Sequence, residues 1–242
     1  VERINNALKM LNLGGASAFL DVEVKKALKE HLTFYDFIEN LLEKDISSKE
    51  DSRTRRWVQQ AKFPFIKTLK DFNFHSKNLE EIDTPLIYEL ASCRFIDEKQ
   101  NVIFLGGTGL GKTHLSISIG VEAINQGKDV RFIGLRELIG LINKTKQDAE
   151  KERRLAAILI RPKLLILDEM GLYNSSPKVS DFIFRVLIQR YENGNSMIFT
   201  SNKDIGNWGH LFGDEERAAV IMDRILQRHK TVVCAGYPAK NH

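Results

Sequence analysis

The sequence predicts an α/β protein in which a parallel five-stranded sheet with flanking helices follows a small all-helical N-terminal domain. From Asp83 onward, short apolar segments alternate with helical patterns, which is typical of a parallel sheet covered by helices. Up to about residue 62, apolar residues keep helical spacing. We place the boundary at residue 70, which gives domains 1–70 and 71–242. The predicted strands are 102–105, 130–133, 164–167, 196–200 and 231–235.

Two capping patterns organise the predicted N-terminal helices. Thr33 and Asp36 form a capping box, so a helix should begin there. Ser47 and Glu50 repeat the pattern and predict a further helix, which Pro64 should stop. The segment from there to Phe74 is rich in phenylalanine and predicts an extended connector.

The composition is that of a globular protein with a basic balance. No apolar run in the sequence approaches the ~20 residues that a bilayer span requires, and no secretory signal is visible. Cys93 and Cys234 are far apart and lack metal-ligand spacing, so we expect two buried free thiols and a reducing, cytoplasmic location. The net charge of +4 permits nucleic-acid binding without requiring it.

A phosphate-binding loop follows the first predicted strand and precedes a helical pattern. It fits G-x-x-x-x-G-K-[ST]. Glycine lets backbone N–H groups turn inward around phosphate oxygens. Lys112 adds a positive charge for the β- and γ-phosphates, and the Thr113 hydroxyl is a ligand for Mg²⁺. The loop residues are Gly106, Gly107, Thr108, Gly109, Leu110, Gly111, Lys112 and Thr113, and His114 follows.

Polar residues follow two further predicted strands. Asp168 and Glu169 end an apolar strand, where α/β sheets place their chemistry. Asp168 is expected to hold Mg²⁺, and Glu169 to polarise the water that attacks the γ-phosphorus. Asn202 follows the next strand and is expected to orient that water or contact the γ-phosphate. These residues favour an ATPase that uses Mg²⁺.

The last predicted helix carries Arg217, Arg224 and Arg228 on one face. An arginine presented to a neighbouring subunit's γ-phosphate would stabilise charge in the transition state. A solvated helix face is the alternative.

Residues 53–70 contain six basic residues and no acid. Basic side chains projecting from a packed helix are expected to contact the phosphates of duplex DNA. An ordinary solvated helix with a lysine-bearing linker is the alternative. The basic residues are Arg53, Arg55, Arg56, Lys62, Lys67 and Lys70.

Nearly the whole chain resembles the IstB family of helper ATPases of insertion-sequence transposition. That family belongs to the AAA+ class of P-loop NTPases, beside the DnaC-type helicase loaders. The resemblance is carried by residues 61–64, 106–115, 165–169, 190–192, 200–203, 207–209, 212–214 and 222–226.

The resemblance implies an N-terminal DNA-binding module, homo-oligomers formed through AAA+ interfaces on DNA, and stimulation of a partner transposase. It also implies that Arg224 is the arginine finger and Asn202 the first sensor. Where the family commonly ends in Gly-x-Ser-Tyr-Arg, this chain has Lys240 in place of the second-sensor arginine, with Pro238 before it. Lys240 lacks the planar fork of arginine, so nucleotide sensing there is an open question.

Two other functions fit the same motifs. A DnaC-type helicase loader would share the ATPase residues and engage a helicase through its N-terminal region. A nucleotide-gated DNA scaffold would assemble on ATP binding without significant turnover. A P-loop kinase is less favoured, because no dedicated acceptor site is visible.

Overall fold

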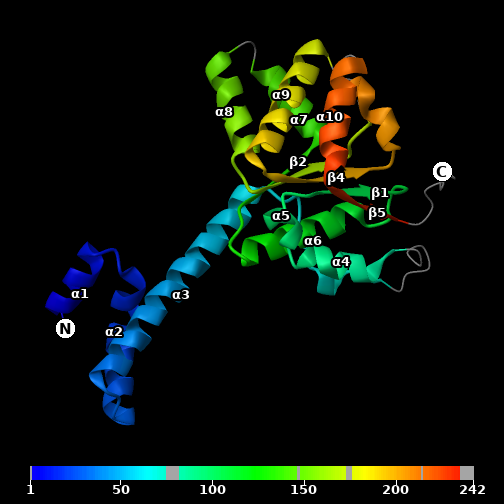
Figure 1. Ribbon diagram of the computed structural model, residues 1–242. Helices are drawn as coiled ribbons and strands as arrows, with labels where there is room; N and C mark the ends of the chain where they lie inside the picture. Colours follow the sequence, from blue (N-terminus) through cyan, green and yellow to red (C-terminus); the bar gives the residue numbers. More distant parts are fainter. Residues whose placement is uncertain (1, 75–81, 146–147, 173–175, 214, 235–242) are drawn as a thin grey trace. The chain divides into compact units, whose positions relative to one another are not determined.

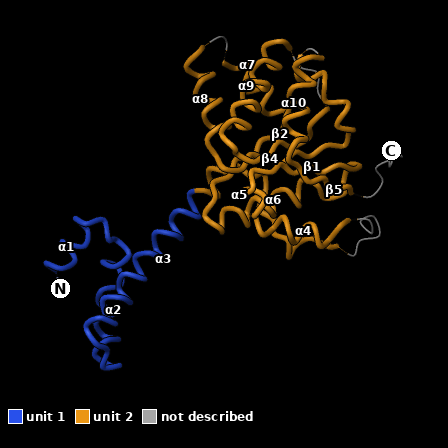
Figure 2. Tube along the Cα trace, viewed as in Figure 1, with its two compact units in different colours: residues 1–56 blue, residues 57–242 orange. Residues whose placement is uncertain are grey.

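The computed structural model describes residues 2–74, 82–145, 148–172, 176–213 and 215–234. The chain separates into two compact units, residues 1–56 and residues 57–242 (Figure 2). The division falls before the boundary expected at residue 70. Trp57, Val58, Ala61 and Phe63 cause the difference, because these side chains pack into the core of the second unit.

The first unit is helical, as predicted. It contains α1 (Glu2–Met10), α2 (Gly14–Glu30) and most of α3 (Phe34–Ala61). The capping box at the start of α3 is confirmed, because Thr33 N–H donates to Asp36 Oδ2 and Asp36 N–H donates to Thr33 Oγ1. The helix start predicted at Ser47 is wrong, since α3 continues through it as a single helix of 28 residues.

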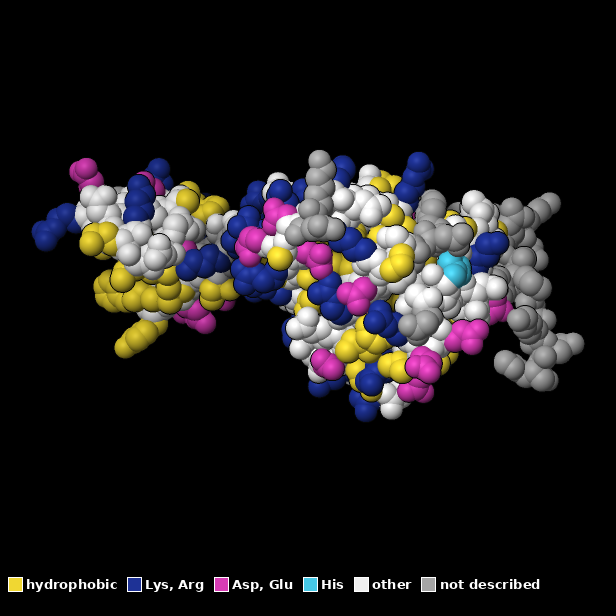
Figure 3. Space-filling model, turned by 90° about the horizontal axis from the view of Figure 1, so that it is seen from above, with side chains coloured by type: hydrophobic (Ala, Val, Ile, Leu, Met, Phe, Trp, Pro, Cys, Tyr) yellow, Lys and Arg dark blue, Asp and Glu magenta, His cyan; other side chains and the backbone are white. Residues whose placement is uncertain are grey.

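Asp45 joins α2 to α3 within this unit. Its Oδ1 accepts hydrogen bonds from the backbone N–H groups of Gly15 and Ala16 at 2.8 and 3.2 Å. A Cβ at Gly15 would lie 2.6 Å from the Asp45 Cα, so only glycine permits this approach. Ala16, Leu20 and Leu41 form the buried core of the unit. Many other hydrophobic side chains stay on its surface (Figure 3).

The second unit contains the predicted sheet. All pairings are parallel, and the strand order is β2-β3-β4-β1-β5 (Figure 1). The strands are β1 (Asn101–Leu105), β2 (Val130–Gly134), β3 (Leu164–Asp168), β4 (Ser196–Ser201) and β5 (His229–Val233). Each predicted strand is present, with ends displaced by one or two residues.

Helices cover both faces of this sheet (Figure 1). Val102 and Phe104 of β1 pack on the side of α4, α5 and α6, and Ile103 and Leu105 pack on the side of α7, α9 and α10. The helices are α4 (Thr84–Ala91), α5 (Arg94–Asp97), α6 (Lys112–Asn125), α7 (Leu135–Lys144), α8 (Ala149–Ile160), α9 (Pro177–Asn193) and α10 (Glu215–Gln227), with 3₁₀ turns η1 (Leu69–Asp71) and η2 (Ile205–Leu211).

The carboxyl ends of β1, β3 and β4 lie at one edge of the sheet. In the parallel register, Leu105 of β1 is opposite Ser201 of β4, and Leu167 of β3 is opposite Phe199. The loops that follow these strands therefore meet there. No helix among the described residues combines the length and apolarity needed to cross a bilayer.

Candidate functional site: a phosphate-binding loop and its acidic strand end

The loop between β1 and α6 has the backbone that its glycines predict. Gly106, Gly109 and Gly111 have φ values of +152°, +83° and +79°, which L side chains rarely adopt. A Cβ at Gly106 would lie 2.7 Å from the Cβ of Cys234, and one at Gly111 would overlap the ring of Phe72. These glycines therefore let Cys234 and the Phe72 ring approach the loop closely, and the loop leads directly into the N-terminus of α6, where backbone N–H groups suit a phosphate.

Lys112 lies folded against this loop. Its Nζ donates to the carbonyl oxygens of Gly106 and Gly107 at 2.8 and 2.6 Å. Burial lowers the pKa of Lys112, whereas Cys234 and Asp168 act in the opposite direction. The ammonium group is thus held beside the space for phosphate by weak carbonyl partners, which phosphate oxygens can replace.

Asp168 is held by threonines from two other elements. Its Oδ1 accepts a 2.8 Å hydrogen bond from Thr113 Oγ1 on α6 and a 2.5 Å hydrogen bond from Thr200 Oγ1 on β4. Thr200 Oγ1 also accepts from the backbone N–H of Glu169 at 3.0 Å. The sequence analysis missed Thr200. The position of Thr200 near the end of a predicted strand was the feature of the sequence that could have identified it.

Glu169 has a left-handed backbone, with φ of 63°. A non-glycine residue in this region costs free energy and often marks a functional turn. Its neighbour Met170 is fixed by a backbone hydrogen bond to the Thr200 carbonyl at 2.8 Å. The turn points Glu169 into the same pocket as Lys112, Thr113 and Asn202.

Asn202 lies at the end of β4, as its predicted sensor role requires. Its Oδ1 is buried and has no hydrogen-bond partner among the described residues. Ser201, next to it, is fully buried, and its Oγ donates to the Met170 carbonyl and accepts from Trp208 Nε1. Asn202 therefore lines the pocket beside a well-bonded Ser201, while its own amide oxygen is buried and unsatisfied.

Lys112, Thr113, Glu169, Thr200 and Asn202 line a pocket of about 320 Å³, large enough for a polyphosphate. Thr113 in its wall and Asp168, which Thr113 contacts, are hard oxygen donors of the kind that Mg²⁺ prefers. Among the described residues, no group of three or more His, Cys, Asp or Glu side chains could hold a metal ion by itself. A magnesium ion here would therefore take its remaining ligands from phosphates and water, as Mg²⁺ does in nucleotide sites.

The connector before α4 reaches this pocket. Phe65 lines it, and the ring of Phe72 meets the ring of His114 edge-on at 5.0 Å between centroids. A hydrogen bond of 3.1 Å joins His114 Nε2 to the Thr68 carbonyl oxygen. The sequence analysis assigned His114 to the nucleotide site, and the structure adds that it braces the connector. Phe65 and Phe72 were missed as neighbours of the loop.

Arg224 lies at the opposite edge of the sheet from the phosphate loop. It lines a cavity of about 260 Å³ with Asn101, Met197 and Arg228, which are near the starts of β1, β4 and β5. Its guanidinium lies 5.1 Å from the centroid of the Tyr191 ring, and its buried Nε has no partner among the described residues. Arg217 is paired with Asp181 and lies over the ring of Phe184, seven residues before Tyr191 on α9, so Arg217 and Arg224 share the face of α10 that meets α9. Arg228 follows the end of this helix and lines the cavity with Arg224.

The predicted DNA-binding residues are exposed but belong to both units. Arg53 and Arg56 line a groove of the first unit with Lys49, between α3 and the start of α2. Arg55 instead turns back, and its Nε donates to the Asp51 carbonyl at 3.3 Å. The others, Lys62, Lys67 and Lys70, lie on the second unit. Lys240 lies outside the described residues.

Solved structures of known proteins share this sheet and its helices. The crystal structure of DnaI is similar to this chain with a TM-score of 0.57 and 24% identity, covering 70% of this chain and 91% of that one. The DnaC helicase loader gives a TM-score of 0.58 with 19% identity over 69% of this chain and 96% of its own. DnaA from Aquifex aeolicus bound to AMPPCP gives 0.54 with 16% identity, over 68% and 49%.

Fold and site together define an ATP-binding protein with the P-loop NTPase fold. A family described as IstB-like ATP binding protein matches residues 6–239, and the chain belongs to that family. It is 34% identical to a protein of insertion sequence IS5376 of Geobacillus stearothermophilus, over 96% of this chain and 90% of that protein. It is 35% identical to a protein of insertion sequence IS21 of Pseudomonas aeruginosa, over 98% and 86%. Both relatives are named for ATP binding.

Proposed function

We propose that this chain is a Mg²⁺-dependent ATPase that assembles on duplex DNA and supports insertion-sequence transposition. The hydrogen-bonded set Thr113–Asp168–Thr200, with Glu169 at its end, is the observation that carries the catalytic part. These hydrogen bonds connect the phosphate loop to Glu169, whose carboxylate is thereby available as the catalytic base.

The residues of the site have distinct roles in the proposed reaction. Lys112 exchanges its two carbonyl partners for β- and γ-phosphate oxygens. Thr113 and Asp168 hold the magnesium ion, which supplies charge neutralisation at the phosphates when bound. Glu169 accepts a proton from the attacking water, and Asn202, in the wall of the same pocket, orients that water.

Two substitutions separate binding from turnover. Lys112→Ala removes phosphate neutralisation and should weaken ATP binding, whereas Glu169→Gln keeps the shape of the side chain and removes the base. Glu169→Gln should bind ATP normally and hydrolyse it ~100-fold or more slowly. Binding is measured with a fluorescent ATP analogue, and turnover by phosphate release. Hydrolysis by Glu169→Gln at the wild-type rate would falsify the assignment of the base.

Arg224 is proposed to act in trans. Strand β1 has five residues with a rise of about 3.3 Å between neighbours, so its two ends are roughly 13 Å apart. Arg224 lies near the start of that strand and the phosphate loop follows its end. This separation from its own phosphate loop supports a role for Arg224 at the nucleotide of a neighbouring copy, with a homo-oligomer as the active form.

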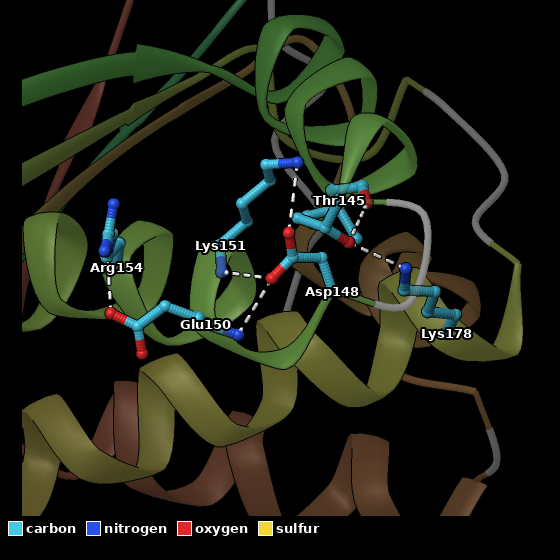
Figure 4. Close-up of polar contacts among 7 residues, drawn as sticks. Thr145, Asp148, Glu150, Lys151, Arg154 and Lys178 are labelled. Carbon is cyan, nitrogen blue, oxygen red and sulfur yellow. Dashed lines mark hydrogen bonds and ion pairs between the residues drawn. The ribbon is translucent and has the colours of Figure 1, made fainter.

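The groove of the first unit is the favoured DNA contact. It brings Arg53 and Arg56 together with Lys49, which the sequence analysis did not select. Basic side chains in a groove suit a phosphate backbone and carry no sequence information. A DNA contact on the second unit, around Lys144 and Lys146, is less favoured. Lys146 lies outside the described residues, and Thr145, which follows α7, accepts a 2.8 Å hydrogen bond from Lys178 Nζ at its Oγ1 (Figure 4).

The transposition role is supported by the insertion-sequence names of the relatives. The alignments with these relatives cover nearly the whole chain, including the helical first unit. A helicase loader remains the second candidate, because DnaC and DnaI share the fold. Pull-down with a transposase encoded beside this chain, against a replicative helicase from the same genome, separates the two. Capture of the helicase alone would favour the loader.

A further inference from the structure

A hollow of about 710 Å³ lies on the second unit, away from the nucleotide pocket. It is formed by the end of α3, the start of β2 and the last turns of α8. Its walls are largely apolar and include Trp57, Val130, Ile158 and Pro162. The Ile158 side chain is 49% exposed, which leaves apolar area open to solvent. Apolar walls of this kind suit a protein side chain better than a sugar–phosphate backbone.

The same hollow carries unpaired positive charge. None of the ion pairs found among the described residues includes Lys62, Arg131 or Arg161. The Nε of half-buried Arg131 has no hydrogen-bond partner among these residues, and its Nη1 donates to the Gln60 carbonyl at 3.1 Å. In contrast, Arg154, which also lines the hollow, is already paired with Glu150 at 2.8 Å (Figure 4). The hollow therefore favours an occupant that is acidic as well as apolar.

The first unit exposes a surface with these properties. Tyr35, Ile38, Leu42 and Ile46 follow one another at helical spacing along α3 and are 87%, 52%, 44% and 58% exposed. We call these four residues the α3 stripe. An apolar row at this spacing is typical of a helix that packs against a partner.

Acidic side chains accompany the α3 stripe. Glu39 and Glu43 are exposed on the same part of the helix, and neither takes part in an ion pair among the described residues. Pairing two α3 stripes with each other would bring these acids together, which costs free energy. A basic hollow with apolar walls removes that repulsion.

We propose that the α3 stripe of one copy docks in the hollow that Trp57, Ile158 and Arg161 line on a second copy. Its apolar side chains cover Trp57 and Ile158, while Glu39 and Glu43 meet the unpaired cations at the rim. The two surfaces differ, so the interface is heterologous and can repeat from copy to copy. This interface lies apart from the nucleotide pocket, so it forms without bound nucleotide.

A labelled peptide tests each side of the interface. A peptide of residues 32–46 is titrated with the full nucleotide-free chain, and binding is followed by fluorescence anisotropy. Arg161→Glu should weaken binding about tenfold or more, because it replaces an attraction by a repulsion. Arg136→Glu is the matched control, since Arg136 is exposed on α7 and lines no part of the hollow. It should bind like the wild type.

Changes in the peptide provide the reciprocal test. Glu39→Lys with Glu43→Lys should abolish binding to the wild-type chain and restore part of it to the Arg161→Glu chain. Tyr35→Ser with Leu42→Ser should weaken binding to both. Circular dichroism checks that Arg161→Glu is folded, and Arg161→Gln gives a smaller effect of the same sign if it is not. Equal binding of the peptide by wild-type and Arg161 variants overturns the proposal.

Sedimentation of the full chain tests whether a second copy occupies the hollow, or whether two α3 stripes pair with each other instead. Arg161→Glu and the Glu39→Lys/Glu43→Lys chain should each self-associate less than the wild type, and their mixture should associate through the intact stripe and hollow and, more weakly, through the charge-reversed pair. Wild-type self-association by Arg161→Glu would indicate pairing of one stripe with another and overturn the proposal. It is equally overturned if Arg161→Glu loses affinity for duplex DNA while binding the peptide normally.

Discussion

The hydroxyl of Thr200 on β4 donates a 2.5 Å hydrogen bond to Oδ1 of Asp168 at the end of β3. The same hydroxyl oxygen accepts from the backbone N–H of Glu169, so one side chain supports both acids of the site. Thr200 is 1% exposed, and water cannot replace it. Its loss should therefore be visible in catalysis as well as in stability.

Thr200→Val keeps the shape and removes the hydroxyl. We expect steady-state turnover to fall on the order of 10–100-fold, as for other groups that orient metal ligands. The free energy of unfolding should fall by about 1–3 kcal/mol, because the Glu169 N–H loses its partner. Phosphate release and urea unfolding measure the two effects. Thr231→Val on β5 is the control and should leave turnover unchanged; equal losses in both variants would remove the special role of Thr200.

Arg224→Ala should bind nucleotide nearly normally and hydrolyse it slowly, because in the proposed homo-oligomer the arginine serves a neighbour's site. Mixing it with Glu169→Gln should restore part of the activity, since some interfaces then combine an intact Glu169 with an intact Arg224. Phosphate release is measured under conditions that allow subunits to exchange. No recovery on mixing would place Arg224 in its own site or outside catalysis.

Duplex DNA binding should depend strongly on salt. If about five of the six basic residues between 53 and 70 contact phosphates, the slope of log K against log salt should be on the order of −4 to −5. Replacing Arg53, Arg55 and Arg56 with alanine should flatten it by about three units, equally for all DNA sequences, and leave ATP binding intact. Anisotropy across a salt series measures the slope.

The matched control removes the same charge from another helix of the first unit. Lys25, Lys26 and Lys29 are exposed on α2, and their replacement with alanine should leave the slope near the wild-type value. Equal flattening by both triple variants would mean that net charge alone determines binding.

The two cysteines predict a loss of stability at high pH. Burial raises the pKa of Cys93 from 9.0 to about 12 and that of Cys234 to about 11. Above pH 9 the unfolded chain therefore releases thiol protons that the folded chain keeps, so stability falls as pH rises through this range. Cys93→Ala should lose less stability than the wild type between pH 8 and pH 10 in urea unfolding. An equal loss of stability in the wild type and in Cys93→Ala would contradict the raised pKa of Cys93.

Local chain chemistry determined much of this protein in advance. The phosphate loop, the acidic strand end and the positions of the strands along the chain were predictable, because each depends on contiguous residues and on a periodic apolar pattern. Both cysteines were expected to be buried free thiols, and both are. The capping box at Thr33 was also correct, since its partners are three residues apart.

The same local reasoning failed where tertiary contacts outweighed it. Ser47 and Glu50 match a helix start, yet α3 passes through them. The expected boundary at residue 70 is displaced to residue 57 by packing that no local pattern reveals.

Only the tertiary structure brought together the residues that complete the site. Thr113, Asp168 and Thr200 are separated by 55 and 32 positions, and the parallel register of β3 and β4 makes them neighbours. The sheet likewise places Arg224 at the edge away from its own phosphate loop. Contacts of this kind depend on strand order and register, which arise from the burial of many apolar side chains at once rather than from any short segment.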